Sequence, residues 1–380
     1  MIRYLVAVAT TMVLGIASPV SAADPIKIGA IVSATGPASF LGEPERNTLH
    51  MLQDQINERG GLLGRPLSLI IYDDETEVNK AVAAANRLLS RDRVVAAIGA
   101  TTSGNTLAII PRFSSAKIPL VSMAAAERIV KPINPWVFKT PQSDRHAVIK
   151  ILEHAKSEAF GNIAILTVSD GFGQAGREVL QELLPEYGMN LVADEIFGPR
   201  DTDMTPQLTK IRGLNPDAII VWGTNPGPAV IARNRVQLGM QTPMYMSHGV
   251  ASKRFIELAG KAAEGLILPV GRLAVADQLP EDHPQKALLL EYIQAYESRF
   301  NAEVSTFGGY AYDALMLIAE AMTRAGEATP QAIRDNLEKT SGFIGTGGIF
   351  EMSPDDHNGL DERAFVMVRI TEGDWELLVE

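Results

Sequence analysis

Hydrophobic and polar positions follow two alternating patterns along this chain, and their order predicts the fold class. Short apolar runs with the character of buried strands are separated by stretches whose apolar positions have helical spacing. In the first part of the chain the expected strands and helices alternate, with strands at 24–32, 66–72, 94–98 and 118–121 and helices at 45–59, 79–90 and 105–115. This series predicts an α/β fold with a parallel sheet covered by helices on both faces.

The same pattern restarts after residue 141, which predicts a second α/β lobe. Its expected strands and helices lie at 162–168, 191–197, 218–222 and 244–246, and at 146–160, 176–187, 203–214 and 229–238. The later segments are an extended stretch at 265–270, helices at 284–300, 310–325 and 330–339, and a closing strand at 364–370. A chain of 380 residues is too long for one ordinary hydrophobic core, so we expect two lobes with a cleft between them.

The first 23 residues have the pattern of a cleavable secretory signal peptide. Arg3 supplies the positive charge, residues 4–16 form the apolar segment, and small residues at 20–22 offer a cleavage site. A membrane anchor is the alternative, but the apolar run is short for a bilayer span and ends in Ser18 and Pro19. We therefore expect an exported, periplasmic protein, and the absence of cysteine means that no disulfide stabilises it.

Composition argues against several other function classes. A net charge of −11 disfavours nucleic acid or an anionic membrane surface as the main partner. The six histidines show no metal-ligand spacing, and there is no G-x-S-x-G nucleophile motif. The acidic run D-D-E at 73–75 is typical of a solvated turn or helix start. We expect no metal, no cofactor and no catalysis.

One motif favours an enzyme. The letters G-F-G-Q-A-G at 171–176 match G-x-G-x-x-G between an expected strand and helix, with Asp194 near the position that would hold a ribose hydroxyl. An exported protein meets little dinucleotide, however, and Asp170 followed by Gly171 equally suits a tight turn. Nucleotide binding is therefore the weaker interpretation of this motif.

Small-residue loops follow two expected strands and predict a binding site. The first, at 99–104, contains Thr101, Thr102 and Ser103, and the second lies at 122–126. Adjacent parallel strands place both loops at the carboxyl edge of the sheet, where doubly wound sheets bind ligands. The exposed N–H groups and dipole of the helix that begins here favour an anion. We predict a pocket for a small carboxylate.

Other residues follow expected strands of the two lobes. Phe40 and Leu41 are apolar residues in a polar loop, which indicates either packing or a wall of the ligand pocket. Thr224 and Asn225 lie in the small, polar loop W-G-T-N-P-G-P at 222–228. His248 follows the expected strand at 244–246, where a place at the cleft and a place on a surface loop are both open.

Several short motifs, in their order and spacing, resemble a known family. They are I-K-I-G-A-I-V-S-A-T-G-P (26–37), G-G-L-L-G-R-P-L (60–67), Y-D-D-E-T (72–76), A-A-I-G-A-T-T-S-G (96–104), I-P-L-V-S (118–122), S-D-G-F-G (169–173), A-A-E-G-L (262–266) and A-Y-D-A-L (311–315). Over nearly all of the mature chain, the sequence resembles periplasmic solute-binding proteins of ABC importers of the branched-chain amino acid (leucine/isoleucine/valine-binding) type.

This resemblance implies a type I periplasmic binding protein fold, in which three hinge strands join two Rossmann-like lobes. Lobe 1 would comprise residues 24–141 plus 272–347, and lobe 2 residues 142–271 plus 348–380. The implied function is that of a monomer that captures a small ligand and delivers it to an ABC permease. A ligand-sensing receptor domain is the alternative of another class.

The resemblance also implies roles for single residues. Ser103 would hold the ligand carboxylate together with backbone groups of Ala124 and Ala126, and Phe172 would face the cleft. Relatives that bind amino acids have a threonine where Ala126 stands. They also have a glutamate, which pairs with the ligand ammonium, where His248 stands if one deletion is allowed.

These departures predict a ligand other than an ordinary amino acid. A buried ammonium without its carboxylate partner loses about 2–5 kcal/mol of binding free energy. With Phe172, Phe40 and Leu41 as apolar walls, the favoured ligand is an aromatic or apolar organic acid, such as a benzoate-type acid. A branched-chain amino acid remains the alternative.

Overall fold

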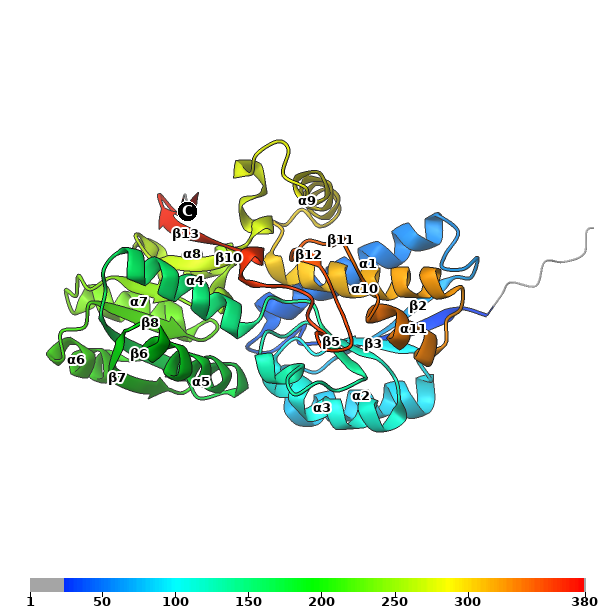
Figure 1. Cartoon of the computed structure of the whole chain (residues 1–380), viewed down its shortest axis with the longest axis horizontal. Coiled ribbons are helices and arrows are strands. Elements are labelled where there is room, and N and C mark those ends of the chain that lie inside the picture. The colour runs from blue at the N-terminus through cyan, green and yellow to red at the C-terminus, as the bar shows by residue number, and fades with distance from the viewer. Residues whose placement is uncertain (1–23, 379–380) are drawn as a thin grey trace, which may run out of the picture.

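The computed structural model describes residues 24–378, which form two α/β halves side by side (Figure 1). The predicted signal peptide lies outside the described residues. The sheet of the first half is parallel and has the order β2-β1-β3-β4-β5. Its strands are β1 (Ile26–Val32), β2 (Leu67–Asp73), β3 (Ala96–Gly99), β4 (Leu120–Ser122) and β5 (Val137–Lys139).

The second sheet has the order β14-β13-β10-β9-β8-β6-β7. Its strands are β6 (Asn162–Val168), β7 (Asn190–Phe197), β8 (Ala218–Trp222), β9 (Met244–Met246), β10 (Ile267–Gly271), β13 (Phe365–Thr371) and β14 (Asp374–Leu377). Strands β13 and β14 pair antiparallel at one edge, whereas β10, β9, β8, β6 and β7 are mutually parallel. The predicted second α/β unit is therefore confirmed, and the pattern did not predict its antiparallel edge.

Helices cover both faces of each sheet, because strands apolar on both sides must be buried on both sides. In the first half, α1 (Ser39–Glu58) and α10 (Thr306–Ala325) cover one face, and α2 (Val78–Arg87) and α3 (Ser103–Ala116) cover the other. In the second half, one face packs against α4 (Asp144–Ser157) and α5 (Gly171–Glu186). The other face packs against α6 (Thr205–Gly213), α7 (Gly227–Gln237) and α8 (Lys253–Ala259).

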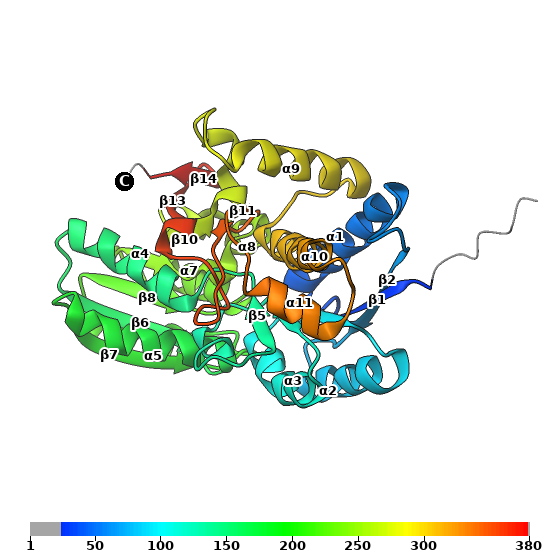
Figure 2. The same ribbon diagram turned by 45° about the vertical axis from the view of Figure 1, so that its right-hand side comes forward.

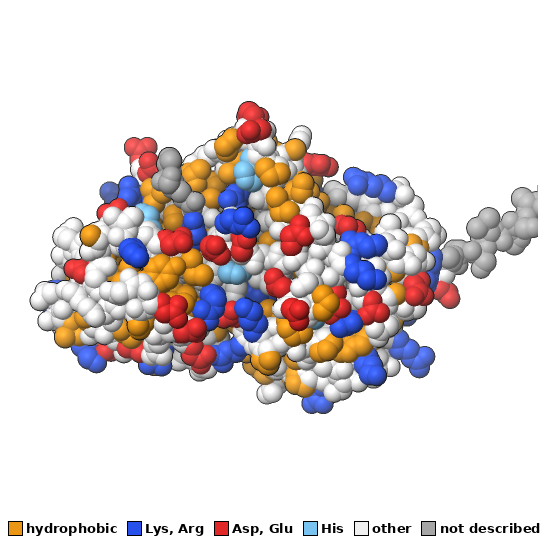
Figure 3. All heavy atoms as spheres, in the orientation of Figure 1, with side chains coloured by type: hydrophobic (Ala, Val, Ile, Leu, Met, Phe, Trp, Pro, Cys, Tyr) orange, Lys and Arg blue, Asp and Glu red, His pale blue; other side chains and the backbone are white. Residues whose placement is uncertain are grey.

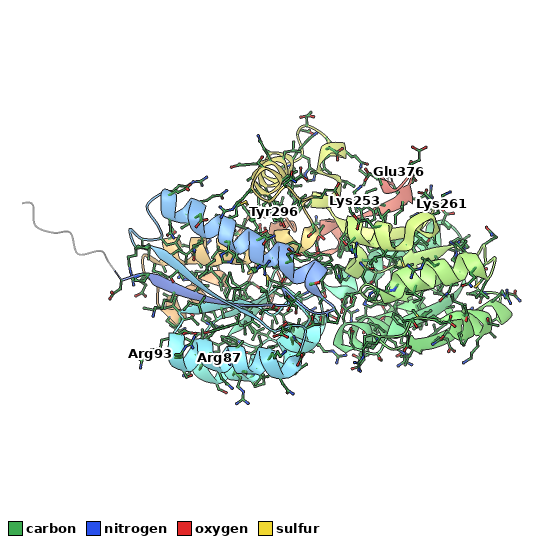
Figure 4. All side chains as sticks on the ribbon, turned by 180° about the vertical axis from the view of Figure 1, so that it is seen from behind. Arg87, Arg93, Lys253, Lys261, Tyr296 and Glu376 are labelled. Carbon is green, nitrogen blue, oxygen red and sulfur yellow. The ribbon has the colours of Figure 1, made fainter. Side chains whose placement is uncertain are left out.

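The remaining elements lie near the junction of the halves or over the first one (Figures 1 and 2). They are α9 (Lys286–Phe300), α11 (Pro330–Leu337) and the small hairpin of β11 (Phe343–Ile344) and β12 (Ile349–Phe350). Helix α9 packs through Tyr296 on α1, whose Asn47 donates a 3.4 Å hydrogen bond to the Tyr296 hydroxyl. Figure 4 shows the position of Tyr296 in the view from behind. Acidic and basic side chains are interspersed over the face shown in Figure 3.

Polar contacts tie together the segments that pass between the halves. Gln142, just after β5, donates a 2.6 Å hydrogen bond to the carbonyl of Gly347, and its side-chain oxygen accepts a 3.1 Å bond from the Tyr310 hydroxyl. The buried carboxylate of Asp313 accepts the N–H groups of Thr346 and Gly347 at 2.6 and 2.7 Å. These bonds fix the first passage, just after β5, relative to residues 346–347 and α10 of the first half.

The division into lobes stays a proposal. Phe350, Met352 and Leu360 pack in the same core as β1, so we propose that the last passage between the lobes lies beyond residue 360. The predicted division placed it at residue 347.

Helix α1 begins six residues before the predicted start at residue 45. The prediction began there because residues 33–42 have the pattern of a turn-rich loop, and Pro44 is also unfavourable inside a helix. Burial overrides this preference: Leu41 is buried, and Gly42 lies so close to the backbone of Ser33 that a Cβ atom would be 2.3 Å from it. Phe40 and Leu41 therefore belong to a helix, and the prediction that they lie in a loop is wrong.

The G-x-G-x-x-G segment is the first part of α5, and its glycines permit close helix–strand packing. Asp170 caps the helix by accepting the N–H groups of Phe172 and Gly173 at 3.0 and 2.9 Å. A Cβ at Gly173 would lie 1.7 Å from the Val168 carbonyl oxygen, and one at Gly176 would lie 2.1 Å from Trp222 Nε1. Asp194, the residue placed near a ribose, instead forms two 2.7 Å bonds with Arg177.

We predict that Gly173→Ala lowers the free energy of unfolding by about 1–3 kcal/mol, because the new methyl group must displace backbone of β6. The matched control is Gly213→Ala at the end of α6, where a Cβ would meet no atom within 4 Å. Urea denaturation of both variants measures the difference. Equal stability of Gly173→Ala and the wild type would show that this glycine is not required for packing.

Candidate ligand-binding site

A buried hydrogen-bond network holds the first small-residue loop at the carboxyl edge of the first sheet. The carboxylate of Asp74 accepts the Ser33 hydroxyl at 2.6 Å, the Asn105 side-chain amide at 2.8 Å and the Thr76 N–H at 2.9 Å. Asp74 is fully buried, so the prediction of a solvated turn is wrong at this residue. Its three donors come from separate segments, and this convergence explains how the carboxylate is satisfied away from water.

Two of the three hydroxyls predicted at this helix end have structural roles. Thr101 donates to the buried carboxylate of Glu45 and accepts the Ser33 N–H at 2.8 Å. Burial raises the pKa of Glu45 well above its usual range, which the bond from Thr101 partly offsets. Thr102 is the N-cap of α3 and accepts the Asn105 N–H at 3.4 Å. The hydroxyl of the third residue, Ser103, contacts the second small-residue loop.

The structure brings Ser103 and the second loop into direct contact. Ser103 Oγ accepts the N–H of Ala126 at 3.3 Å, and both residues are buried. Ala124 is also buried, and its N–H donates to Ser122 Oγ at 3.1 Å. The residues expected to hold a ligand carboxylate therefore lie together at the N-terminus of α3, as the order of the parallel strands predicted.

In the second half, His248 lies among aromatic rings. Its ring centroid is 5.4 Å from that of Phe172, 5.6 Å from that of Trp222 and 5.3 Å from that of Phe365. His248 follows β9 and is only 3% exposed, so its placement on a surface loop is excluded. Burial lowers the pKa of His248 to about 3, assisted by Lys139 and His146, so the imidazole is neutral at pH 7.

The two halves meet where α3 and α5 begin. A Cβ on Gly171 would lie 3.1 Å from the backbone of Gly104, so the two helix starts are in close contact. Ala124 and Ala126 share an apolar cluster with Ala175 of α5. Figures 1 and 2 both show these two helix ends facing each other across the junction. The carboxylate-binding candidates of one half thus lie against the helix that carries Phe172 in the other.

The other predicted site residues are divided between the two halves. Phe40 packs edge-to-face on Phe307 of α10 with centroids 6.0 Å apart, and Leu41 is buried in the core beneath the first sheet. The buried Asn225 and the half-buried Thr224 precede α7. Their loop is held beside His248, because Ser247 Oγ donates a 3.0 Å bond to the carbonyl of Gly223.

Two buried charged residues near His248 were not predicted. Asp144 Oδ1, at the start of α4, lies 3.9 Å from His248 Nε2. Lys139, at the end of β5, donates to the carbonyls of Ala125 at 2.8 Å and Pro141 at 3.2 Å. Burial raises the pKa of Asp144 to about 7 and lowers that of Lys139 to about 8, while each charge favours the other. The one signal in the sequence is that Lys139 directly follows an apolar run.

The helices of residues 24–378 all lack either the length or the apolar character that crossing a bilayer requires. In the same residues, no three His, Asp or Glu side chains are grouped so that they could hold a metal ion.

The chain belongs to the periplasmic binding protein family, whose model matches residues 25–374. It is 26% identical to the "Leucine-, isoleucine-, valine-, threonine-, and alanine-binding protein" of Pseudomonas aeruginosa, over 90% of this chain and 89% of that protein. It is 25% identical to the Leu/Ile/Val-binding protein of Escherichia coli, over 70% of this chain and 72% of that one. The predicted family resemblance is confirmed.

Solved structures share the whole architecture. An extracellular ligand-binding receptor from Rhodopseudomonas palustris superimposes with a TM-score of 0.88 at 30% identity, covering 93% of this chain and 99% of that one. The branched-chain amino acid transporter substrate binding protein LivJ from Streptococcus pneumoniae, in complex with isoleucine, gives 0.82 at 25% identity, with coverage of 93% and 99%. The predicted type I periplasmic binding protein fold is confirmed.

We predict that His248 makes the protein less stable in mild acid. Its pKa is about 3 in the folded state, against an ordinary value near 6.5 when unfolded, so the unfolded state binds the proton first as the pH falls. Between pH 7.5 and 5 this residue should cost roughly 2 kcal/mol of unfolding free energy. Asp144 acts in the opposite sense, because its folded pKa is raised.

The comparison of wild type with His248→Phe isolates this contribution. Urea denaturation at both pH values should show a smaller acid-induced loss in the variant. An equal loss in both proteins would mean that His248 is accessible to protons in the folded state.

Proposed function

We propose that the mature protein is the extracytoplasmic, periplasmic solute-binding component of an ABC importer, exported through its N-terminal signal peptide. It captures a small carboxylate between two lobes, makes and breaks no bond, and delivers the ligand to a membrane permease as a monomer. Ligand binding stabilises the closed arrangement of the lobes, which is the form that the permease recognises. The family and the confirmed fold support this proposal.

The contact between Ser103 and Ala126 is the observation from which we assign a position to the ligand carboxylate. A hydroxyl donor, a backbone N–H and the positive end of a helix dipole converge at one point, and such a point stabilises an anion. In the structure these two groups bond each other, so a carboxylate can replace that single bond with charge-assisted bonds to both. The ammonium group of Lys139 donates a hydrogen bond to the Ala125 carbonyl of the second loop, so its positive charge lies next to that loop.

For the rest of the ligand we favour an aromatic or apolar organic acid. Three aromatic rings surround a neutral His248, and Ala126 has no hydroxyl to serve an amino group. An ammonium at Asp144 would add a second cation beside the buried Lys139, which like-charge repulsion disfavours.

A branched-chain amino acid is the second candidate. It is favoured by the names of the relatives, including the LivJ structure that contains isoleucine, and by the buried carboxylate of Asp144 near His248. A ligand-sensing receptor is a candidate of another class, since the similar Rhodopseudomonas palustris structure is described as an extracellular ligand-binding receptor.

A thermal-shift screen of residues 24–380 should separate these candidates. The ligands are benzoate, phenylacetate, leucine and valine, with a nicotinamide nucleotide as the test of the enzyme alternative. A true ligand at 100-fold its dissociation constant stabilises the fold by roughly 2.7 kcal/mol. We expect stabilisation by the aromatic acids; stabilisation by leucine or valine alone would assign the second candidate instead.

We predict that Ser103→Ala weakens binding of the best carboxylate about 10–100-fold, because it removes a hydrogen bond to a charged group. The matched control, Ser157→Ala, changes an exposed serine at the end of α4 and should bind like the wild type. Isothermal titration calorimetry measures both affinities. Unchanged affinity in Ser103→Ala would mean that the loop before α3 supports the fold only.

A further inference from the structure

Four buried polar atoms meet at one place in the second half without hydrogen-bond partners. They are the two carboxylate oxygens of Asp144 and the two ring nitrogens of His248, none of which has a partner within residues 24–378. Buried polar groups are almost always paired, because an unpaired group loses its bonds to water and gains nothing in return. This concentration of unpaired atoms indicates a position where a ligand group makes the missing bonds.

The separation of the two side chains defines what that group can be. Asp144 Oδ1 and His248 Nε2 are 3.9 Å apart, which is too long for a direct hydrogen bond. A single atom about 2.8 Å from each would make an angle of about 90° between them, which is close to the geometry of a hydroxyl oxygen. A hydroxyl suits the His248 tautomer whose Nε2 carries the proton, because it accepts from that N–H and donates to the carboxylate, whereas an ammonium suits the tautomer whose Nε2 is unprotonated.

Charges around the pair also favour an uncharged group. Lys139 is also buried, and its charge and that of Asp144 each favour the ionised form of the other. The rings of Phe172, Trp222 and Phe365 surround His248 and bring no charge. A second anion would meet Asp144, and a second cation would meet Lys139. A hydroxyl avoids both conflicts.

This position is connected to the predicted carboxylate site. The N–H of Asp144 donates to the carbonyl of Ala125 at 3.3 Å, and Ala125 stands between the two alanines whose backbone is expected to bind the ligand carboxylate. Ala125 also packs in the same apolar cluster as Phe172 and Trp222. One small molecule can therefore place its carboxylate at Ser103 and its body against the rings.

We propose that Asp144 and His248 form a subsite for a hydroxyl group, so that the preferred ligand is a hydroxylated carboxylic acid. The subsite rests on the proposed function and deepens it, because it names the second polar group of the ligand. Asp144 is then a specificity-determining residue that neither the sequence pattern nor the family resemblance indicated.

Calorimetric titrations of residues 24–380 test this subsite. The probes are phenylacetate, its 2-, 3- and 4-hydroxy derivatives, and leucine, each with wild type, Asp144→Leu and His248→Leu. In Asp144→Leu, the new side chain matches that of aspartate in shape and lacks both carboxylate oxygens. We expect at least one hydroxy derivative to bind the wild type about tenfold or more tighter than phenylacetate. In both variants this ratio should fall to about twofold or less.

Asp313→Asn is the matched control, because Asp313 is a fully buried carboxylate whose partners are all in the first half. It should lower the melting temperature and leave the binding ratio unchanged. If Asp144→Leu does not fold, as judged by its melting curve, His248→Leu alone carries the comparison.

Two results would overturn the subsite while the proposed function stands. The first is equal binding of phenylacetate and all hydroxy derivatives to the wild type, which would mean that ordered water bonds the pair. The second is tight leucine binding that Asp144→Leu abolishes, which would assign Asp144 to an ammonium. If no carboxylate binds the wild type, the proposed function fails first.

Discussion

The buried carboxylate of Asp74 is the group on which the first half of the site depends. It directly follows β2 and bonds Ser33 after β1 and Asn105 in α3, so it joins the carboxyl ends of two neighbouring strands to the start of α3. Removing it would leave these donors buried and unpaired, which costs more than the bonds themselves contribute. Together with the bonds of Thr101 to Glu45 and Ser33, this acceptor holds the loop before α3, and with it Ser103, in one arrangement.

The two halves differ in whether the buried polar side chains near the junction have hydrogen-bond partners. Around Asp74 each described side-chain donor and acceptor has a hydrogen-bond partner within the first half, whereas the side-chain atoms of Asp144 and His248 have none within residues 24–378. A satisfied network holds the loop before α3 rigidly in one geometry. The unsatisfied atoms are the ones that we propose discriminate between carboxylate ligands.

Much of the fold could be predicted because it depends on local pattern. Residues 162–168, 218–222 and 244–246 have the predicted strand boundaries, since each is an apolar run between clear turn residues. The proximity of the loops that contain Ser103 and Ala126 followed from strand order, because parallel neighbours end at one edge. These features need only the nearest residues and a simple rule of topology.

The rest depends on contacts between distant segments, which no local pattern contains. The early start of α1 results from packing of Gly42 on Ser33, against the preference of Pro44. The burial of Asp144 arises where β5, α4 and the segment after β9 converge, far apart in sequence. A carboxylate beside a helix start gives the same sequence signal whether it is solvated or buried.

A crystal structure of the mature protein with its most stabilising carboxylate would show where the ligand carboxylate binds. We expect it to lie within hydrogen-bond distance of both Ser103 Oγ and the Ala126 N–H, in place of the bond between them. A ligand bound between closed lobes with its carboxylate away from Ser103 would mean that the loop before α3 is not the carboxylate site.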